Sequence, residues 1–119
     1  MKENILLEKA KNFGVRIIKL ARFLDDKKQK ALANQVLRSG TSIGANISES
    51  EYAVSNADFI NKLQIARKEA NETKYWIELL KEAEIIDEKQ FESLHNDVIE
   101  LLKILGASVI TAKKKSNFS

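Results

Sequence analysis

The sequence predicts an all-α protein, an antiparallel up-down-up-down four-helix bundle, and three observations support this fold. Proline is absent from the 119 residues, and hydrophobic residues make up 44% and charged residues 31% of the chain, a composition typical of globular proteins. Apolar residues recur at steps of three and four along four long segments, as they do on the buried face of a helix. Only a few residues separate these segments, and short connections favour antiparallel neighbours.

A chain of 119 residues is expected to fold as one domain with a hydrophobic core of its own. We assign residues 1–112 to the bundle and the polar, lysine-containing residues 113–119 to a basic disordered tail. The N-terminal segment carries Glu3, Asn4 and Glu8 where a signal peptide needs an uninterrupted apolar run. No apolar run approaches the roughly 20 residues that span a membrane. We therefore expect a cytoplasmic protein with no membrane partner.

The first helix is predicted from about Asn4 to Leu24. Its apolar positions step by four and three and would form one side of the core: Leu6, Ala10, Phe13, Ile17, Leu20 and Leu24. The next four residues, 25–28, are all charged and predict a turn. Because Asp26 and Gln29 have the spacing of a capping box, we expect Asp26 to cap the second helix.

The second helix is predicted to run through a stretch crowded with small and polar residues, LRSGTSIGANISESEY at 37–52. Gly40 and Gly44 should each cost a helix about 1 kcal/mol relative to alanine, and the Ser, Thr and Asn side chains compete for backbone hydrogen bonds. Inward positions nevertheless keep helical spacing: Leu32, Val36, Gly40, Ile43 and Ile47. We therefore predict a helix to the end of this stretch, with a narrow side that admits a close neighbour. The alternative is a helix that ends near Ser39 and a loop to Ala45.

The third helix has a strong start signal. Ser55 and Asp58 have the spacing of an N-cap and an acidic first turn, and Val54 and Phe59 occupy the positions of a hydrophobic staple. The apolar seam that follows has a heptad-like spacing: Phe59, Leu63, Ala66, Ala70, Thr73, Ile77 and Leu80. We expect a long amphipathic helix here.

The fourth helix begins in the same way. Asp87 and Gln90 have the capping-box spacing, and Ile86 and Phe91 form the expected staple. The seam then continues at helical spacing: Phe91, Leu94, Val98, Leu101, Leu105, Ser108, Val109 and Ala112. Four such helices with short connections complete the predicted bundle.

No signature of catalysis, of a cofactor or of a metal emerges from the residues. A di-iron bundle needs Glu-x-x-His on two helices; Glu92 and His95 supply this motif once, and His95 is the only histidine. The serines lack the base and the elbow of a nucleophile. The segment from Gly40 to Gly44 lacks the lysine and the preceding strand of a phosphate-binding loop. We expect no enzyme activity, no cofactor and no small-molecule substrate, and interpret His95 as a surface or interface residue.

A polar cluster is predicted between the second and third helices. If these helices form an antiparallel hairpin, equivalent depths place Arg38 within reach of Glu69 or Glu72, and Asn46 near Lys62. A buried charge is costly unless it is paired. One interpretation is a structural Arg38–Glu72 pair that fixes the register of the two helices. The other is a polar contact to another subunit or to an RNA phosphate.

Residues 37–49, LRSGTSIGANISE, closely resemble the second-helix signature of the 23S rRNA-intervening sequence protein family, also called the S23 or four-helix-bundle family. The run 59–80, with ARKEANE at 66–72, is similar to the same family, and the resemblance spans essentially the whole chain. It implies a small bacterial four-helix bundle without recognised catalytic residues. Some members are encoded inside large-subunit rRNA genes, and a relative that partners a reverse transcriptase assembles as a pentameric barrel. The resemblance therefore implies a homo-oligomer, expected to be a homopentamer.

The leading functional hypothesis is a non-enzymatic oligomer that acts as an accessory factor for RNA or a nucleoprotein. Five copies of a chain with a net charge of +3 would carry +15, which favours nucleic acid through counterion release. The phosphate contacts are assigned to five basic residues on the first and third helices: Arg16, Lys19, Arg22, Lys62 and Arg67. The alternative is a protein–protein scaffold that binds no nucleic acid.

Overall fold

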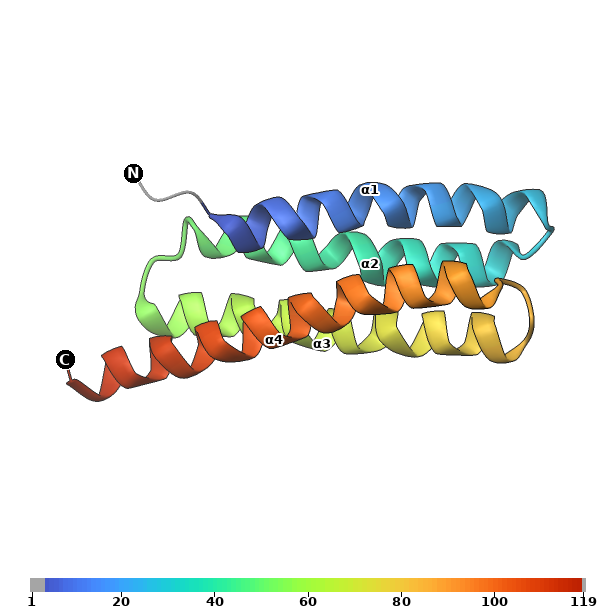
Figure 1. The fold of residues 1–119 in the computed structure, drawn as a ribbon. Helices are drawn as coiled ribbons and strands as arrows, with labels where there is room; N and C mark the ends of the chain where they lie inside the picture. The colour runs from blue at the N-terminus through green and yellow to red at the C-terminus, as the bar shows by residue number, and fades with distance from the viewer. Residues whose placement is uncertain (1–3, 119) are drawn as a thin grey trace.

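The computed structural model describes residues 4–118, and all regular structure in that range is helical. The four helices are α1 (Ile5–Asp26), α2 (Lys30–Ser50), α3 (Asn56–Glu82) and α4 (Glu88–Phe118). They lie alongside one another in a body that measures 51 × 24 × 21 Å (Figure 1). The prediction of an all-α bundle of four helices is confirmed. In Figure 1 the chain reverses direction at each connection between helices.

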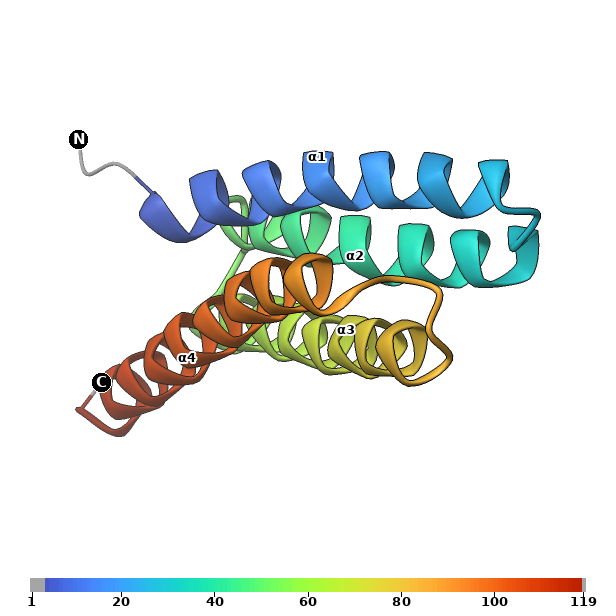
Figure 2. The same ribbon diagram turned by 45° about the vertical axis from the view of Figure 1, so that its right-hand side comes forward.

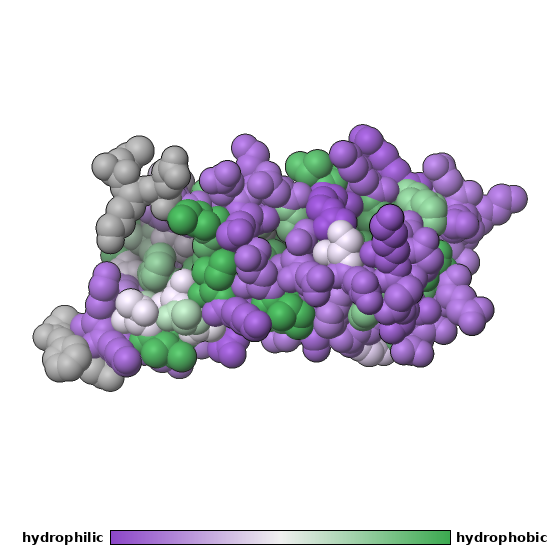
Figure 3. All heavy atoms as spheres, viewed as in Figure 1, coloured by the Kyte–Doolittle hydropathy of each residue, from purple (hydrophilic) through white to green (hydrophobic). Residues whose placement is uncertain are grey.

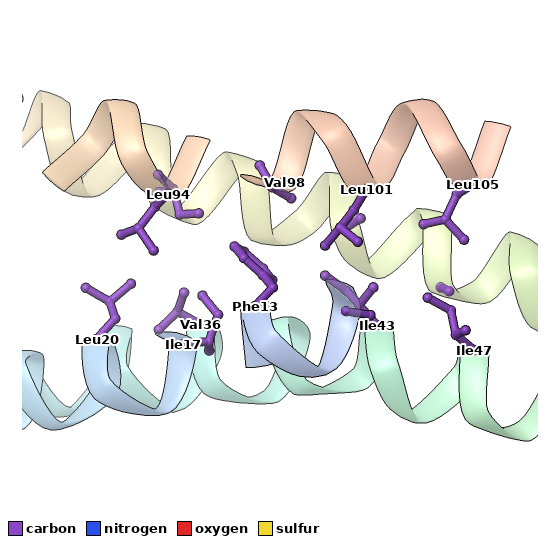
Figure 4. Close-up of a cluster of buried hydrophobic side chains, with 14 of the residues drawn as sticks. Phe13, Ile17, Leu20, Val36, Ile43, Ile47, Leu94, Val98, Leu101 and Leu105 are labelled. Atoms are coloured by element: carbon purple, nitrogen blue, oxygen red, sulfur yellow. The ribbon is translucent and has the colours of Figure 1, made fainter. Parts of the chain in front are cut away.

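The core lies along the middle of this body. Side chains from α1 and α2 point toward those of α4 (Figure 4), and ten of them are labelled there: Phe13, Ile17, Leu20, Val36, Ile43, Ile47, Leu94, Val98, Leu101 and Leu105. All ten are buried. Full burial of one such side chain stabilises the fold by about 1.5–3 kcal/mol. The positions that step by three and four in the sequence are therefore the positions that hold the helices together.

The small residues of α2 lie against α1. A Cβ atom added to Gly40 would approach Cγ1 and Cγ2 of Ile17 to 2.7 Å, and one added to Gly44 would lie 3.6 Å from the backbone of Ala10. The helix continues through this stretch, so the alternative of a loop after Ser39 is wrong. The hydroxyl of Thr41 donates to a carbonyl oxygen one turn back at 2.7 Å, which satisfies a polar side chain within the helix.

The starts of α3 and α4 follow their predicted caps. Ser55 Oγ accepts a hydrogen bond from the backbone nitrogen of Asp58 at 3.0 Å. Asp87 and Gln90 form a reciprocal capping box, with bonds of 2.9 and 2.7 Å. The staple expected before α3 is absent, because Val54 is 92% exposed and does not pack on the helix.

The start of α2 differs from the prediction. Asp26 is the last residue of α1, and Gln29 is the N-cap of α2 without a side-chain capping bond. Between them Lys28 adopts a left-handed conformation with φ 62°, which lets the Gln29 nitrogen donate to the carbonyl oxygen of Leu24 at 2.9 Å. The turn therefore closes α1 through its backbone, so the predicted Asp26 cap is wrong.

The C-terminal half of α4 diverges from α1. In Figure 2 the end of α4 lies far from α1. Two ion pairs join them near the middle of the bundle, Arg16 with Asp97 at 2.5 Å and Lys9 with Glu100 at 3.2 Å. Residues 113–118 continue α4 as a helix instead of forming the disordered tail expected for 113–119; residue 119 lies outside the described residues.

Candidate functional site

A polar cluster joins α2 to α3 at mid-length. Arg38 Nη1 lies 3.2 Å from Glu69 Oε2, and the Nη2 atom donates to Glu72 Oε2. The Arg38 side chain is 50% exposed, while those of Glu69 and Glu72 are 15% and 30% exposed. Arg38 thus contacts both carboxylates that the hairpin register placed near it. Asn46 is not part of this cluster, because its Nδ2 atom donates to the carbonyl oxygen of Ser42 at 2.9 Å on the same helix.

A buried hydrogen bond between α2 and α3 lies next to this cluster. The hydroxyl of Thr73 on α3 lies 2.8 Å from Ser39 Oγ on α2, and both side chains are fully buried. It also lies 2.8 Å from the carbonyl oxygen of Glu69. The sequence analysis placed Thr73 in the apolar seam of the third helix but did not predict its hydrogen bond with Ser39. Helical spacing shows which side of a helix is buried, but not which side chain of the next helix a hydroxyl will contact.

Two aromatic residues extend the cluster along α3. Trp76 Nε1 donates to Glu72 Oε2 at 3.0 Å, so the same carboxylate binds both Trp76 and Arg38. The Tyr75 ring packs edge-on against Trp76 with centroids 5.4 Å apart, and Tyr75 and Leu79 are both exposed. We call Arg38, Glu72, Tyr75, Trp76 and Leu79 the aromatic face. It combines the residue types, Trp, Tyr and Arg, that carry most binding energy at protein interfaces.

The five basic residues predicted to contact phosphate are divided between two helices that are not neighbours in the described bundle. Arg16, Lys19 and Arg22 lie on α1, whereas Lys62 and Arg67 lie on α3, and α1 and α3 do not pack against each other over residues 4–118. Arg16 is engaged in the fold: its guanidinium contacts Asp97 Oδ2 at 2.5 Å and Ser93 Oγ at 2.8 Å.

The end of α4 gathers positive charge that these predictions did not include. From residue 101 to residue 118 the chain has four lysines and neither aspartate nor glutamate: Lys103, Lys113, Lys114 and Lys115. All four are exposed on a helix. The Arg67 guanidinium of α3 reaches the same half of α4, where it would lie 3.8 Å from a Cβ added to Gly106. We call these four lysines and Arg67 the basic end. The acid-free run is visible in the sequence, but its attachment to an ordered helix is not.

His95 is held between α3 and α4. Its Nε2 atom lies 3.1 Å from Glu78 Oε2, and its ring stacks on Phe91 with centroids 4.7 Å apart. Within residues 4–118 no group of three or more His, Cys, Asp or Glu residues is placed to hold a metal ion. No helix of this described range combines the length and the hydropathy needed to cross a membrane.

The comparisons with known proteins agree with this fold. The family model described as 23S rRNA-intervening sequence protein matches residues 2–107. A crystal structure from Bacteroides thetaiotaomicron VPI-5482, described as a protein with unknown function from the S23 ribosomal protein family, is 52% identical and superposes with a TM-score of 0.87; the match covers 88% of this chain and 98% of that one. No curated protein matches this chain. The chain belongs to the 23S rRNA-intervening sequence protein family.

Proposed function

We propose that this protein is a non-enzymatic homo-oligomer of antiparallel, up-down-up-down bundles that associates with RNA through the basic end. The observation that carries the proposal is the acid-free second half of α4, where four exposed lysines lie on one ordered helix and Arg67 of α3 reaches this half at Gly106. An RNA backbone presents closely spaced phosphates, and each lysine that neutralises one releases a counterion. From residue 101 onward α4 carries no carboxylate of its own. We assign the phosphate contacts mainly to Lys113 and Lys114, because Lys103 and Lys115 line a groove between α3 and α4.

Assembly multiplies this charge. Each chain contributes a net charge of +3, and a pentamer, as the family resemblance implies, would present five copies of the basic end. Repeated weak contacts to one RNA raise the overall affinity well beyond that of a single copy. The proposed role is therefore that of an accessory factor that holds or organises RNA, with no chemical step.

The test is the salt dependence of RNA binding, measured by fluorescence anisotropy with a labelled RNA hairpin. The variant Lys113→Gln/Lys114→Gln should bind more weakly, and the slope of log affinity against log salt should fall by about 1 for each lysine that contacts a phosphate. The control Lys30→Gln/Lys89→Gln removes the same charge from exposed positions on α2 and at the start of α4 and should leave the slope nearly unchanged. Equal affinity and slope for both variants would contradict the proposal.

A second candidate is a scaffold that binds another protein and no nucleic acid. The aromatic face favours it, because Tyr75 and Leu79 are exposed beside the Arg38–Glu72–Trp76 contacts. Leu79→Ser would weaken binding of a protein partner at this face while leaving RNA affinity unchanged. A protein interface of this kind should depend little on salt, whereas phosphate binding weakens steeply. Salt dependence thus separates the two candidates.

A further inference from the structure

The connection between α2 and α3 carries two apolar side chains that nothing in the described chain covers. Tyr52 is 81% exposed and Val54 is 92% exposed, the highest values among the large hydrophobic residues of the described range. Both belong to the short segment 51–55 between the two helices. Glu49 and Glu51 precede them in the chain and are also exposed. Glu51 Oε1 accepts a hydrogen bond from Asn4 Nδ2 at 2.5 Å, and the Glu49 side chain points its charge to solvent at the end of α2. We call residues 49–54, which comprise the last two residues of α2 and most of the connection, the acidic loop.

A groove of about 740 Å³ opens at the same end of the molecule. The start of α3 and the second half of α4 line it, with an apolar floor that includes Phe59, Ile104 and Ala107. Lys103 and Lys115 lie on its lining as well. Figure 3 shows hydrophobic residues gathered over this part of α4. The groove is open because α4 turns away from α1 there (Figure 2), which leaves this side of the helix uncovered.

We propose that the acidic loop of one copy docks into this groove on a second copy of the chain. The two surfaces are complementary in two respects: exposed apolar side chains meet an apolar floor, and the glutamates of the loop face Lys103 and Lys115 of the groove. Lys113 and Lys114 of the basic end do not line the groove and stay available for RNA. The volume lies within the usual range of binding pockets. This inference rests on the proposed homo-oligomer and names the contact that would form it.

The position of the two surfaces fits a closed ring. Asn56 begins α3 directly after the loop and also lines the groove, so both surfaces lie at one end of the bundle (Figure 1). A loop and a groove on the same chain form a heterologous contact, and such contacts close into a ring when the rotation allows it. Copies standing side by side with the same end upward bring each loop level with the groove of the next copy.

The docking can be tested by solution mass, measured by light scattering after size-exclusion chromatography. Tyr52→Ser/Val54→Ser changes two exposed residues outside the helices, so the bundle should keep its helical circular dichroism. We expect the assembly to weaken on the order of 100-fold, as for the loss of central apolar contacts at an interface. The matched control Val15→Ser/Ile18→Ser removes two exposed apolar side chains from α1 and should leave the mass unchanged.

A mixing experiment identifies the occupant of the groove. Ala107→Trp fills the groove from an exposed position on α4 and should also yield a monomer. Each variant retains the surface that the other lacks, so an equimolar mixture of Ala107→Trp with Tyr52→Ser/Val54→Ser should form a dimer of the two and stop there.

The outcomes separate this inference from the proposed function. A wild-type monomer would overturn both the oligomer and the docking. A wild-type oligomer whose mass survives Tyr52→Ser/Val54→Ser would overturn the docking alone and leave the oligomer standing. Two monomeric variants that fail to form a mixed dimer would also overturn it.

Discussion

Replacement of Gly40 by alanine tests how closely α1 and α2 approach each other. At an open helical position this change stabilises a helix by about 1 kcal/mol. At Gly40 the new Cβ would stand 2.7 Å from Cγ1 and Cγ2 of Ile17. Ile17 is fully buried, and these two atoms are attached directly to its Cβ, so they cannot move aside by a change at the end of a flexible side chain. The helices would have to separate.

Gly14 supplies the matched control. It lies in α1, and a Cβ added there would meet nothing within 4 Å. Both variants gain the same helix propensity, so the difference in their free energies of unfolding reports the overpacking at Gly40. Overpacking of a core typically costs about 1–3 kcal/mol. We therefore expect Gly40→Ala to unfold at a lower temperature than Gly14→Ala, by about 3–6 °C for each kcal/mol in a domain of this size.

The assay is thermal unfolding followed by circular dichroism, with all variants at one protein concentration because assembly shifts the apparent stability. In the Ile17→Ala background, where Cγ1 and Cγ2 are absent, Gly40→Ala should lose most of its penalty, and the double-mutant cycle measures this coupling. If Gly40→Ala is as stable as Gly14→Ala, the close contact between α1 and α2 is not present in solution.

Three further changes test the contacts of α3. Thr73→Val removes the buried hydroxyl bonded to Ser39, and we expect a loss of about 1 kcal/mol in urea unfolding; unchanged stability would mean that the bond contributes nothing. Arg38→Ala should cost less than about 1 kcal/mol because the guanidinium is half exposed, and the structural role of its pair with Glu72 is contradicted if both melting temperature and oligomer mass stay unchanged. Ser55→Ala deletes the N-cap of α3 and should lower stability by about 1 kcal/mol, whereas Tyr52→Ser nearby should leave the unfolding of the monomer unaffected.

The helices could be predicted well where apolar spacing and a cap coincide. The side chains of Asp87 and Gln90 each accept a hydrogen bond from the backbone nitrogen of the other residue. Because both residues lie within four positions of the sequence, their spacing alone predicts this contact. The same spacing at Asp26 and Gln29 misled, because the left-handed Lys28 lets the backbone close the end of α1 without a side-chain cap. A capping-box spacing identifies a start of a helix only where the preceding helix has already ended.

The end of α4 could not be predicted from its own residues. Residues 113–116, the part of the helix beyond Ala112 whose burial is described, are all exposed, so the apolar spacing gave no reason for the helix to continue. It is held from another helix: Asn56 of α3 donates to the carbonyl oxygen of Ala112 at 2.9 Å and to the hydroxyl of Ser116. Contacts between residues this far apart in the chain are not visible in a sequence pattern.

The contacts of the candidate sites also differ in how well the sequence could predict them. The Arg38 contacts follow from the register of one hairpin between adjacent helices, so equivalent depths were sufficient to place them. The partner of Arg16, Asp97, lies on α4, and no pattern in the sequence around Arg16 reveals it. Arg16 was therefore assigned to phosphate as an exposed basic residue. The groove at the start of α3 arises from the divergence of α4, which depends on how the whole bundle packs.

The most direct measurement is the solution mass of the wild-type protein by light scattering, repeated with an RNA hairpin at a low and a moderate salt concentration. We predict an oligomer that binds the RNA at low salt and releases most of it at moderate salt. A monomer would contradict the proposed assembly, and an oligomer whose mass does not change with RNA at either salt concentration would contradict the proposed association with RNA.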